Sequence, residues 1–222
     1  MRIGLFGGTF NPIHVGHLRA ALEVKEEFAL EKIFLIPAAL PPHKERGHVV
    51  DAADRLQMIH LAVTPECGFS VSEVELRRTG ISYTIDTVCH FKHILPAGTC
   101  LYLVMGLDAF LEIDSWKSYT DLLREVPLIV ISRPAAAHPD PSSGWQTLGN
   151  YLQSKISAHY RFSASQSCYL HAQGNQPIHI FAVTALDISS TQIRKRIKQG
   201  RSIKFLVPEK VADYIQTRGL YL

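Results

Sequence analysis

The chain has 222 residues, 46% of them hydrophobic and 19% charged, a composition typical of a globular protein and unlike that of a disordered or fibrous one. No apolar run reaches the roughly 18 residues of a membrane span, and the four cysteines lie far apart without a Cys-x-x-Cys pair, which argues against a zinc site or a disulfide scaffold. The formal net charge is +3, but residues 188–222 alone hold eight Lys or Arg and two acidic residues. This segment is either a solvated helix face or a contact for a polyanion.

Strands and helices alternate along the chain. Short apolar runs predict strands over residues 2–6, 32–36, 69–74, 100–105, 127–132 and 178–183, and apolar residues at helical spacing predict helices over residues 17–30, 53–63 and 84–94. Strands separated by helices of this length imply right-handed crossovers and a parallel sheet. The predicted fold class is therefore α/β: a doubly wound, Rossmann-like open parallel sheet with helices on both faces.

Residues 134–175 interrupt this rhythm. They are rich in Pro, Ser, Gln and His, with one helical stretch near residues 145–156. No second set of apolar residues large enough for a core accompanies them, so we expect a surface excursion within a single domain of residues 1–222. We also expect a basic helical segment from about residue 188, and a cytoplasmic protein that has no contact with a membrane.

The first polar cluster follows the first predicted strand, at the strand end where open parallel sheets bind ligands. It reads Gly-Gly-Thr-Phe-Asn-Pro-Ile-His-Val-Gly-His over residues 7–17. Glycine lets a ligand approach the backbone, and His14 and His17 are spaced to share one side of a helix start. Two imidazoles at a positive helix end suit a phosphate that gains charge. The pair alone would equally fit a capped helix start; the glycines and the preceding strand favour the phosphate site.

The second polar cluster follows the last predicted strand and reads Ile-Ser-Ser-Thr-Gln-Ile-Arg over residues 188–194. Ser189 and Gln192 have the spacing of a capping box, so a helix begins here. Ser190 and Thr191 add hydroxyls to its first turn, and Arg194 adds a cation. Such a helix start binds phosphates well, although plain capping remains the alternative for this cluster taken alone.

Together, the two clusters resemble the HxGH nucleotidyltransferase superfamily. Shorter motifs between and after them resemble the bacterial nicotinate-nucleotide adenylyltransferases: Pro-Pro-His-Lys at 41–44, Tyr-Thr-Ile-Asp-Thr at 83–87, Gly-Leu-Asp at 106–108 with Trp116, and Arg-Gly-Leu-Tyr at 218–221. The resemblance runs from residue 3 to residue 221 and leaves only residues 134–175 without motifs. One departure is Asn11, where the family frequently has Asp; we assign Asn11 no catalytic role.

The resemblance implies a reaction of NAD biosynthesis, in which ATP and nicotinate mononucleotide give deamido-NAD and pyrophosphate. A phosphate oxygen of the mononucleotide attacks the α-phosphorus of ATP in line, with no covalent enzyme intermediate. Transfers of this kind ask the protein mainly for positioning and charge stabilisation. Mg²⁺ bridging the leaving phosphates is expected with ATP, although the sequence shows no acidic cage for it.

The resemblance also implies a role for each site residue. His14 and His17 are the catalytic pair that holds the α-phosphate. The expected ATP contacts are Gly8, Thr9, Phe10, Lys44, Asp108, Ser190, Thr191 and Arg194. Among these, Asp108 would accept from the ribose hydroxyls, and its alternative role is to cap the short helix that follows.

A separate pocket for the pyridine ring is expected around Trp116, within Asp-Ser-Trp-Lys-Ser at 114–118. A flat indole can stack on a pyridine, and helix-start N–H groups can receive its carboxylate. Ser118 is the expected N-cap of the next helix, Thr84 the N-cap of an earlier one, and Lys117 lies between Trp116 and Ser118. The pocket should favour nicotinate over nicotinamide. The alternative for Trp116 is a partly buried core residue.

Three other functions share part of this sequence pattern. A phosphopantetheine adenylyltransferase shares the two end motifs, but such chains are shorter and lack the middle motifs. A nicotinamide-mononucleotide enzyme is separated only weakly by sequence. A nucleic-acid-binding protein would interleave aromatic and basic residues, and residues 194–201 contain no aromatic residue. The expected partners are therefore ATP and nicotinate mononucleotide, without nucleic acid.

Overall fold

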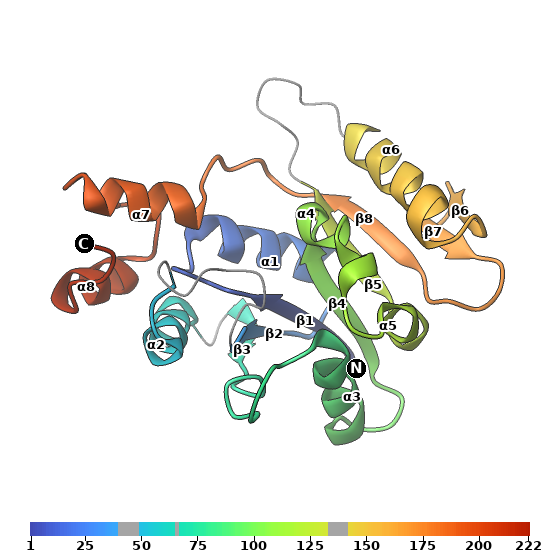
Figure 1. The fold of residues 1–222 in the computed structure, drawn as a ribbon, viewed down its shortest axis with the longest axis horizontal. Coiled ribbons are helices and arrows are strands. Elements are labelled where there is room, and N and C mark those ends of the chain that lie inside the picture. Colours follow the sequence, from blue (N-terminus) through green and yellow to red (C-terminus); the bar gives the residue numbers. More distant parts are fainter. Residues whose placement is uncertain (40–48, 65–66, 133–141) are drawn as a thin grey trace.

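The computed structural model describes residues 1–39, 49–64, 67–132 and 142–222. These residues form one eight-stranded sheet with the order β3-β2-β1-β4-β5-β8-β7-β6 (Figure 1). The strands are β1 (Arg2–Gly8), β2 (Lys32–Pro37), β3 (Phe69–Val71), β4 (Cys100–Gly106), β5 (Leu128–Ser132), β6 (Tyr160–Ser163), β7 (Cys168–His171) and β8 (Ile178–Ala182). The helices are α1 (Val15–Glu27), α2 (Ala52–Ala62), α3 (Thr84–Ile94), α4 (Leu107–Phe110), α5 (Tyr119–Glu125), α6 (Ser142–Tyr151), α7 (Ser190–Lys198) and α8 (Glu209–Thr217).

The six predicted strands are confirmed, and they pair in parallel from β3 through β8. The predicted fold class is confirmed with them. The largest difference in length is at β3, predicted over 69–74 and observed over Phe69–Val71. The backbone N–H of Ser72 still donates to Leu35 at 3.0 Å, and the chain then turns away from the sheet edge.

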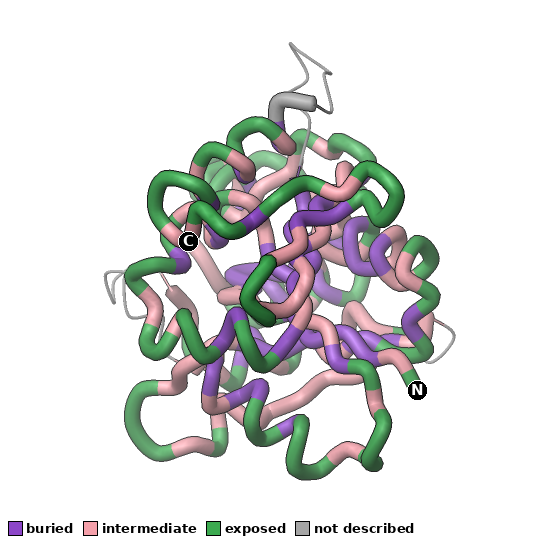
Figure 2. The backbone as a smooth tube through the Cα atoms, turned by 90° about the vertical axis from the view of Figure 1, so that its right-hand side faces the viewer, coloured by how far each residue is buried: buried purple, intermediate pink, exposed green. Residues whose placement is uncertain are grey.

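Helices cover both faces of the sheet because side chains along each strand alternate between two apolar clusters. In β1, Ile3 and Leu5 join the cluster that α3, α5 and α6 complete, whereas Phe6 joins the cluster of α1, α2, α7 and α8. Figure 2 shows the buried segments running through the centre, with exposed segments outside them. Within the described residues, no helix combines the length and apolar character needed to span a membrane.

The structure differs from the expectation of a surface excursion at residues 134–175. In the described part of this segment, β6 and β7 form an antiparallel hairpin that extends the sheet beyond β8. Leu148, Leu152 and Tyr160 are buried in the same cluster as α3 and α5. The expected helix over 145–156 is α6, which continues as one π-helical turn over Leu152–Ile156. The segment contributes to the core because these buried side chains pack in the same cluster as Ile178 and Ile180 of β8.

The sheet order places a topological switch point between β1 and β4. From β1 the chain winds outward through β2 to β3, and then returns to β4 on the other side of β1. Crossovers leave the two strands on opposite faces, so a crevice opens at their carboxyl ends. Residues 9–14 and Gly106 lie at these ends, and α7 begins after β8 and packs beside the same region (Figure 1).

Candidate active site

The loop after β1 is held by the side chain of Phe10, which is buried. Its ring lies over Gly8, where an added Cβ would come within 2.9 Å of the Phe10 Cζ atom. The ring also packs edge-to-face on Phe6 and His17, with centroid distances of 5.9 and 5.1 Å. Phe10 has a φ of 47°, a left-handed conformation that residues with a side chain rarely adopt. Gly8 and Phe10 therefore shape the loop together and support His17.

His14 and His17 lie together at the start of α1, as predicted from their spacing. The helix begins at Val15, two residues before the predicted start, with His14 as its N-cap. The backbone N–H of His14 donates to Nδ1 of His17 at 3.3 Å, and the rings stack with centroids 3.7 Å apart. Because Nδ1 of His17 accepts, the proton of its neutral ring lies on Nε2. His14 is 1% exposed, whereas His17 is half-buried.

The second polar cluster adjoins the first. Ser189 caps α7 and forms the predicted capping box with Gln192, each side chain bonding the other residue's backbone N–H at 3.2 Å. The hydroxyl of Ser190 donates to the carbonyl oxygen of Pro12 at 2.9 Å. The guanidinium of Arg194 donates to the carbonyl of Asn11 at 2.8 Å and to the Thr191 hydroxyl at 3.2 Å. The start of α7 is thus joined directly to the loop after β1.

Asp108 lies on α4, immediately after β4 and next to the loop that follows β1. It is exposed, and its carboxylate bends back over Gly106, where an added Cβ would clash with the Oδ1 atom. Gly106 is the N-cap residue of α4, and no side-chain cap bond forms there. Asp108 is therefore a first-turn residue of α4 and not its N-cap, and its carboxylate lies next to Gly106 at the end of β4.

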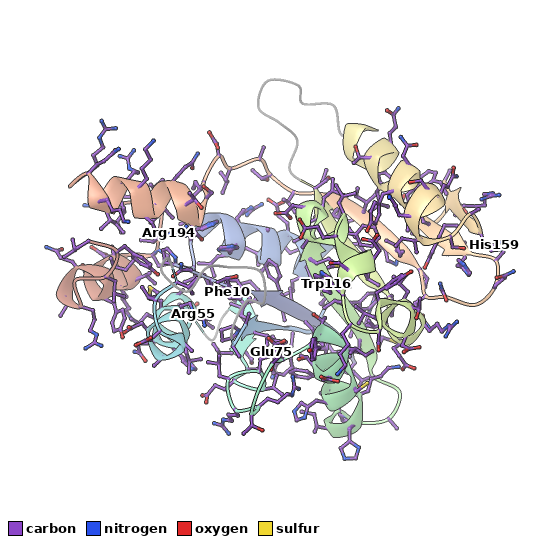
Figure 3. The ribbon with its side chains drawn as sticks, viewed as in Figure 1. Phe10, Arg55, Glu75, Trp116, His159 and Arg194 are labelled. Carbon is purple, nitrogen blue, oxygen red and sulfur yellow. The ribbon has the colours of Figure 1, made fainter. Side chains whose placement is uncertain are left out.

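The third group of predicted residues lies where the 114–118 segment meets α3. The Lys117 ammonium sits 4.2 Å from the ring centroid of Tyr83 and 3.7 Å from Oδ2 of Asp86. Trp116 is half-buried and packs against the core cluster of α3 and α5. In the view of Figure 3, Phe10 lies between Arg194 and Trp116. The core contact expected as the alternative for Trp116 is present, and it leaves part of the indole exposed.

Two predicted caps differ from the structure. Tyr83, with φ −112° and ψ 145°, is the N-cap of α3, so Thr84 is its first helical residue. Ser118 does occupy the N-cap position of α5, but its φ of 50° is left-handed and its side chain makes no cap bond. Capping side chains normally need an extended backbone to reach back to the helix. Lys44, predicted as a phosphate cation, lies outside the described residues.

Arg55 on α2 is a residue that the sequence analysis missed. Its side chain is 1% exposed and donates to four backbone carbonyls: Nη1 to Thr9 at 2.9 Å and Ala38 at 2.8 Å, Nη2 to Ala39 at 3.1 Å, and Nε to Val50 at 3.2 Å. Burial lowers the pKa of this guanidinium. Arg55 therefore ties the loop after β1 to Ala38 and Ala39, which follow β2, and to Val50, which precedes α2. The sequence does contain one sign of its burial: Arg55 lies three and four residues before the apolar Met58 and Ile59, a spacing that places all three on one face of the helix.

Two relatives of similar sequence have the same name. The cytidylyltransferase-like family model matches residues 5–196. A relative from Desulfatibacillum aliphaticivorans is 41% identical over 229 residues, covering all of both chains. A second, from Moorella thermoacetica, is 43% identical over 220 residues, covering 99% of this chain and 91% of its own. Each is named a probable nicotinate-nucleotide adenylyltransferase.

A solved structure has the same fold at low sequence identity. The nicotinic acid mononucleotide adenylyltransferase of Plasmodium falciparum, complexed with NaAD, aligns with a TM-score of 0.71 and 18% identity. The alignment covers 99% of this chain and 97% of that one. The family model and the full-length relatives establish the relationship that the motifs indicated. The chain belongs to the cytidylyltransferase-like family and, within it, to the nicotinate-nucleotide adenylyltransferases.

Proposed function

We propose that the protein transfers the adenylyl group of ATP to nicotinate mononucleotide, giving deamido-NAD and pyrophosphate. The phosphate oxygen of the mononucleotide attacks the α-phosphorus, and the bond from that phosphorus to the bridging oxygen of the β-phosphate breaks. One observation carries the proposal: the His14–His17 pair and the start of α7 meet at the switch point, joined by the bonds of Ser190 and Arg194 to Pro12 and Asn11. Two anion-binding helix starts at one crevice suit a chain of three phosphates.

His17 is the residue best placed to stabilise the transition state. Its Nδ1 atom accepts from the backbone, so its Nε2 proton is the one that can be donated to an α-phosphate oxygen. The ring is fixed in orientation by stacking on His14 and by the edge of Phe10. A donor held ready in this way costs little reorganisation when charge builds on the oxygen. We assign His14 the same target, with Gly8 and Thr9 lining the site beside it.

The leaving pyrophosphate is assigned to the start of α7. Thr191 and the first-turn N–H groups provide neutral donors, and the Arg194 guanidinium provides the cation. Ser190 already donates to Pro12, so it orients the loop as well as the helix. Asp108, exposed at the end of β4, is assigned to the ribose hydroxyls. Lys44 is assigned to the phosphates from the sequence resemblance alone.

We propose that Mg²⁺ binds together with ATP, through the phosphates of the nucleotide. Among the described residues, no group of three or more His, Cys, Asp or Glu is arranged to hold a metal ion. Mg²⁺ commonly keeps several waters and binds through substrate phosphates rather than a protein cage. The residues at the crevice fit ATP that brings its own Mg²⁺, and the protein groups described above act on the phosphates directly. A cytoplasmic location, where ATP is available, belongs to the same proposal.

The acceptor is assigned to the space between α3 and the 114–118 segment. Trp116 offers a partly exposed indole face for the pyridine ring. Thr84 is the first residue of α3, a position where the backbone N–H has no carbonyl partner within the helix. Lys117 adds a positive charge next to Tyr83. A carboxylate gains more from these groups than a neutral amide does, so nicotinate mononucleotide is the preferred acceptor.

Product identification tests the proposal. The protein is incubated with ATP, Mg²⁺ and nicotinate mononucleotide, and the products are separated and weighed by mass spectrometry. The proposal predicts deamido-NAD and pyrophosphate in equal amounts. Parallel reactions contain phosphopantetheine or no acceptor. Product with phosphopantetheine alone would assign a different acceptor, and ADP or AMP released without any acceptor would contradict adenylyl transfer.

A further inference from the structure

The C-terminal tail reaches the loop of the candidate active site. After α8 ends at Thr217, the chain turns through Gly219 and brings Tyr221 back toward β1. The Tyr221 hydroxyl donates to Oδ1 of Asn11 at 2.9 Å, across 210 residues of sequence. Leu222, the next residue, is 86% exposed. Leu220 and Tyr221 also pack against the core cluster of α1, α2, α7 and α8, and the Tyr221 hydroxyl adds a polar contact with the loop between β1 and α1.

Asn11 joins this tail contact to Arg194. Its side-chain Oδ1 accepts from Tyr221 and from the backbone N–H of Val50, at 2.9 and 3.2 Å. Its backbone carbonyl accepts from the Arg194 guanidinium at 2.8 Å. Asn11 is only 4% exposed, so water is a poor substitute for these partners. The orientation of the Asn11 peptide thus fixes where the Arg194 guanidinium lies.

Backbone strain on both sides of the Tyr221–Asn11 bond indicates that the arrangement is held by its surroundings. Tyr221 has a φ of 68°, and Phe10, which precedes Asn11, has a φ of 47°. Left-handed conformations of this kind are unfavourable for residues with a Cβ and persist only where neighbouring contacts enforce them. Burial also raises the pKa of Tyr221, so its hydroxyl keeps its proton and acts as a donor. The loop conformation and the tail conformation support one another through this bond.

We propose that Tyr221 is a positioning residue for ATP: its hydroxyl holds Asn11, and Asn11 holds the Arg194 guanidinium in line with the phosphates that leave. This inference rests on the proposed function for the role of Arg194. The tail makes no direct contact with substrate in this account. Its effect is to place a charged group that would otherwise sample many rotamers, and side-chain ordering of this kind adds to the affinity for a ligand.

The chain contains a matched control for the tail hydroxyl. Tyr214 on α8 is also half-buried, and its hydroxyl donates to Oδ1 of Asp54 at 2.7 Å. Tyr214→Phe therefore removes a comparable tail hydrogen bond from a residue outside the candidate active site. Tyr221→Phe keeps the ring and removes the hydroxyl that donates to Asn11. A difference between the two variants separates positioning of Arg194 from general loosening of the C-terminal segment.

The experiment measures the dissociation constant for Mg²⁺–ATP by calorimetry, together with the thermal midpoint and the KM of each substrate. Tyr221→Phe is expected to weaken ATP binding about three- to tenfold, the effect of losing one hydrogen bond. The KM for nicotinate mononucleotide should stay within about twofold in the same variant, since its pocket lies at α3. Tyr214→Phe should shift the thermal midpoint similarly and leave ATP binding unchanged.

A double-mutant cycle tests the route through Arg194. In an Arg194→Gln background, Tyr221→Phe should change ATP binding by less than about twofold, because the group that it positions is gone. Equal ATP affinity in wild type and Tyr221→Phe would overturn the inference, as would equal losses in the Tyr221 and Tyr214 variants. If the protein binds ATP but forms no deamido-NAD, the proposed function fails and the affinities still decide this inference. A wild-type protein without ATP binding would overturn both.

Discussion

The imidazole rings of His14 and His17 stack with centroids 3.7 Å apart, and the backbone N–H of His14 donates to Nδ1 of His17. The same contact caps α1 and selects the tautomer of His17. A histidine at this position therefore serves the fold and the proposed chemistry through different nitrogens. Nδ1 accepts from the helix start, and Nε2 carries the proton that we propose is donated to substrate.

This division of roles predicts different results for two substitutions. His17→Ala should lower the turnover number by about 10²- to 10³-fold, the usual effect of losing a preorganised donor. His17→Asn offers an oxygen that can accept from the His14 N–H as Nδ1 does, but lacks a donor at the position of Nε2. It should restore thermal stability toward wild type without restoring turnover. Steady-state pyrophosphate release and thermal melts measure both effects, and normal turnover in either folded variant would contradict the role of His17.

The indole of Trp116 is expected to serve the acceptor and not ATP. Trp116→Ala should raise the KM for nicotinate mononucleotide about tenfold or more, given the 1–3 kcal/mol that stacking on an aromatic side chain contributes. Trp116→Phe keeps an aromatic face and should recover much of this loss. Trp145→Phe, which changes the other tryptophan of the chain on α6, is the control. Equal increases in the KM of both substrates would argue that Trp116 is only a core residue.

Much of this fold can be predicted from the sequence because buried parallel strands appear as apolar runs. All five residues of β5 are buried, and α3 has the bounds that its periodicity predicts. The hairpin of β6 and β7 escapes prediction for a physical reason. Its strands have four residues each, lie in a Ser- and Gln-rich segment, and are stabilised by pairing with β8, a partner that local sequence does not identify.

The candidate site is predictable where its residues are contiguous. His14, His17 and the cluster from Ser189 to Arg194 are found because each set follows a strand and starts a helix. The contacts of Arg55 and Tyr221 are not predicted, even though Tyr221 belongs to a recognised motif, since most of their partners lie 16–46 and 210 residues away in the sequence. Asn11 was assigned no role because its oxygen atoms acquire their function only through those distant donors.

The four hydrogen bonds of the buried Arg55 side chain predict that its removal strongly destabilises the protein. Arg55→Ala leaves four backbone carbonyls without their donor and should lower the free energy of unfolding by on the order of 3 kcal/mol. Arg77→Ala, which breaks an exposed pair with Glu73 at 3.0 Å, should cost less than about 0.5 kcal/mol. Urea denaturation followed by circular dichroism compares them. Similar small losses for both variants would contradict the structural role of Arg55.

A carboxyl group next to α3 predicts a pH dependence. Burial raises the pKa of Glu75 above its ordinary value of 4.5, against the opposing effects of the Thr87 hydrogen bond and the Arg78 charge. The fold therefore favours the neutral carboxyl. Its contribution to stability is complete below pH 4.5 and is lost as pH rises through the raised pKa.

The test compares unfolding free energies of wild type and Glu75→Gln from acidic to neutral pH. Gln keeps an oxygen that can accept from the Thr87 hydroxyl and does not ionise. Wild type should lose stability relative to Glu75→Gln as pH rises above 4.5. Glu27→Gln, which removes one exposed negative charge on α1, is the control. Parallel pH profiles for wild type and Glu75→Gln would refute the expectation.

The most direct measurement of the central claim is the rate of pyrophosphate release from ATP and Mg²⁺ with nicotinate mononucleotide, nicotinamide mononucleotide or no acceptor. Adenylyl transfer predicts release only when an acceptor is present, and the acceptor site proposed between α3 and Trp116 predicts a higher kcat/KM for nicotinate mononucleotide. Equal kcat/KM values for the two acceptors would still support adenylyl transfer, but they would contradict the proposal that the site recognises the carboxylate of nicotinate. Absence of release with both acceptors would contradict the account itself.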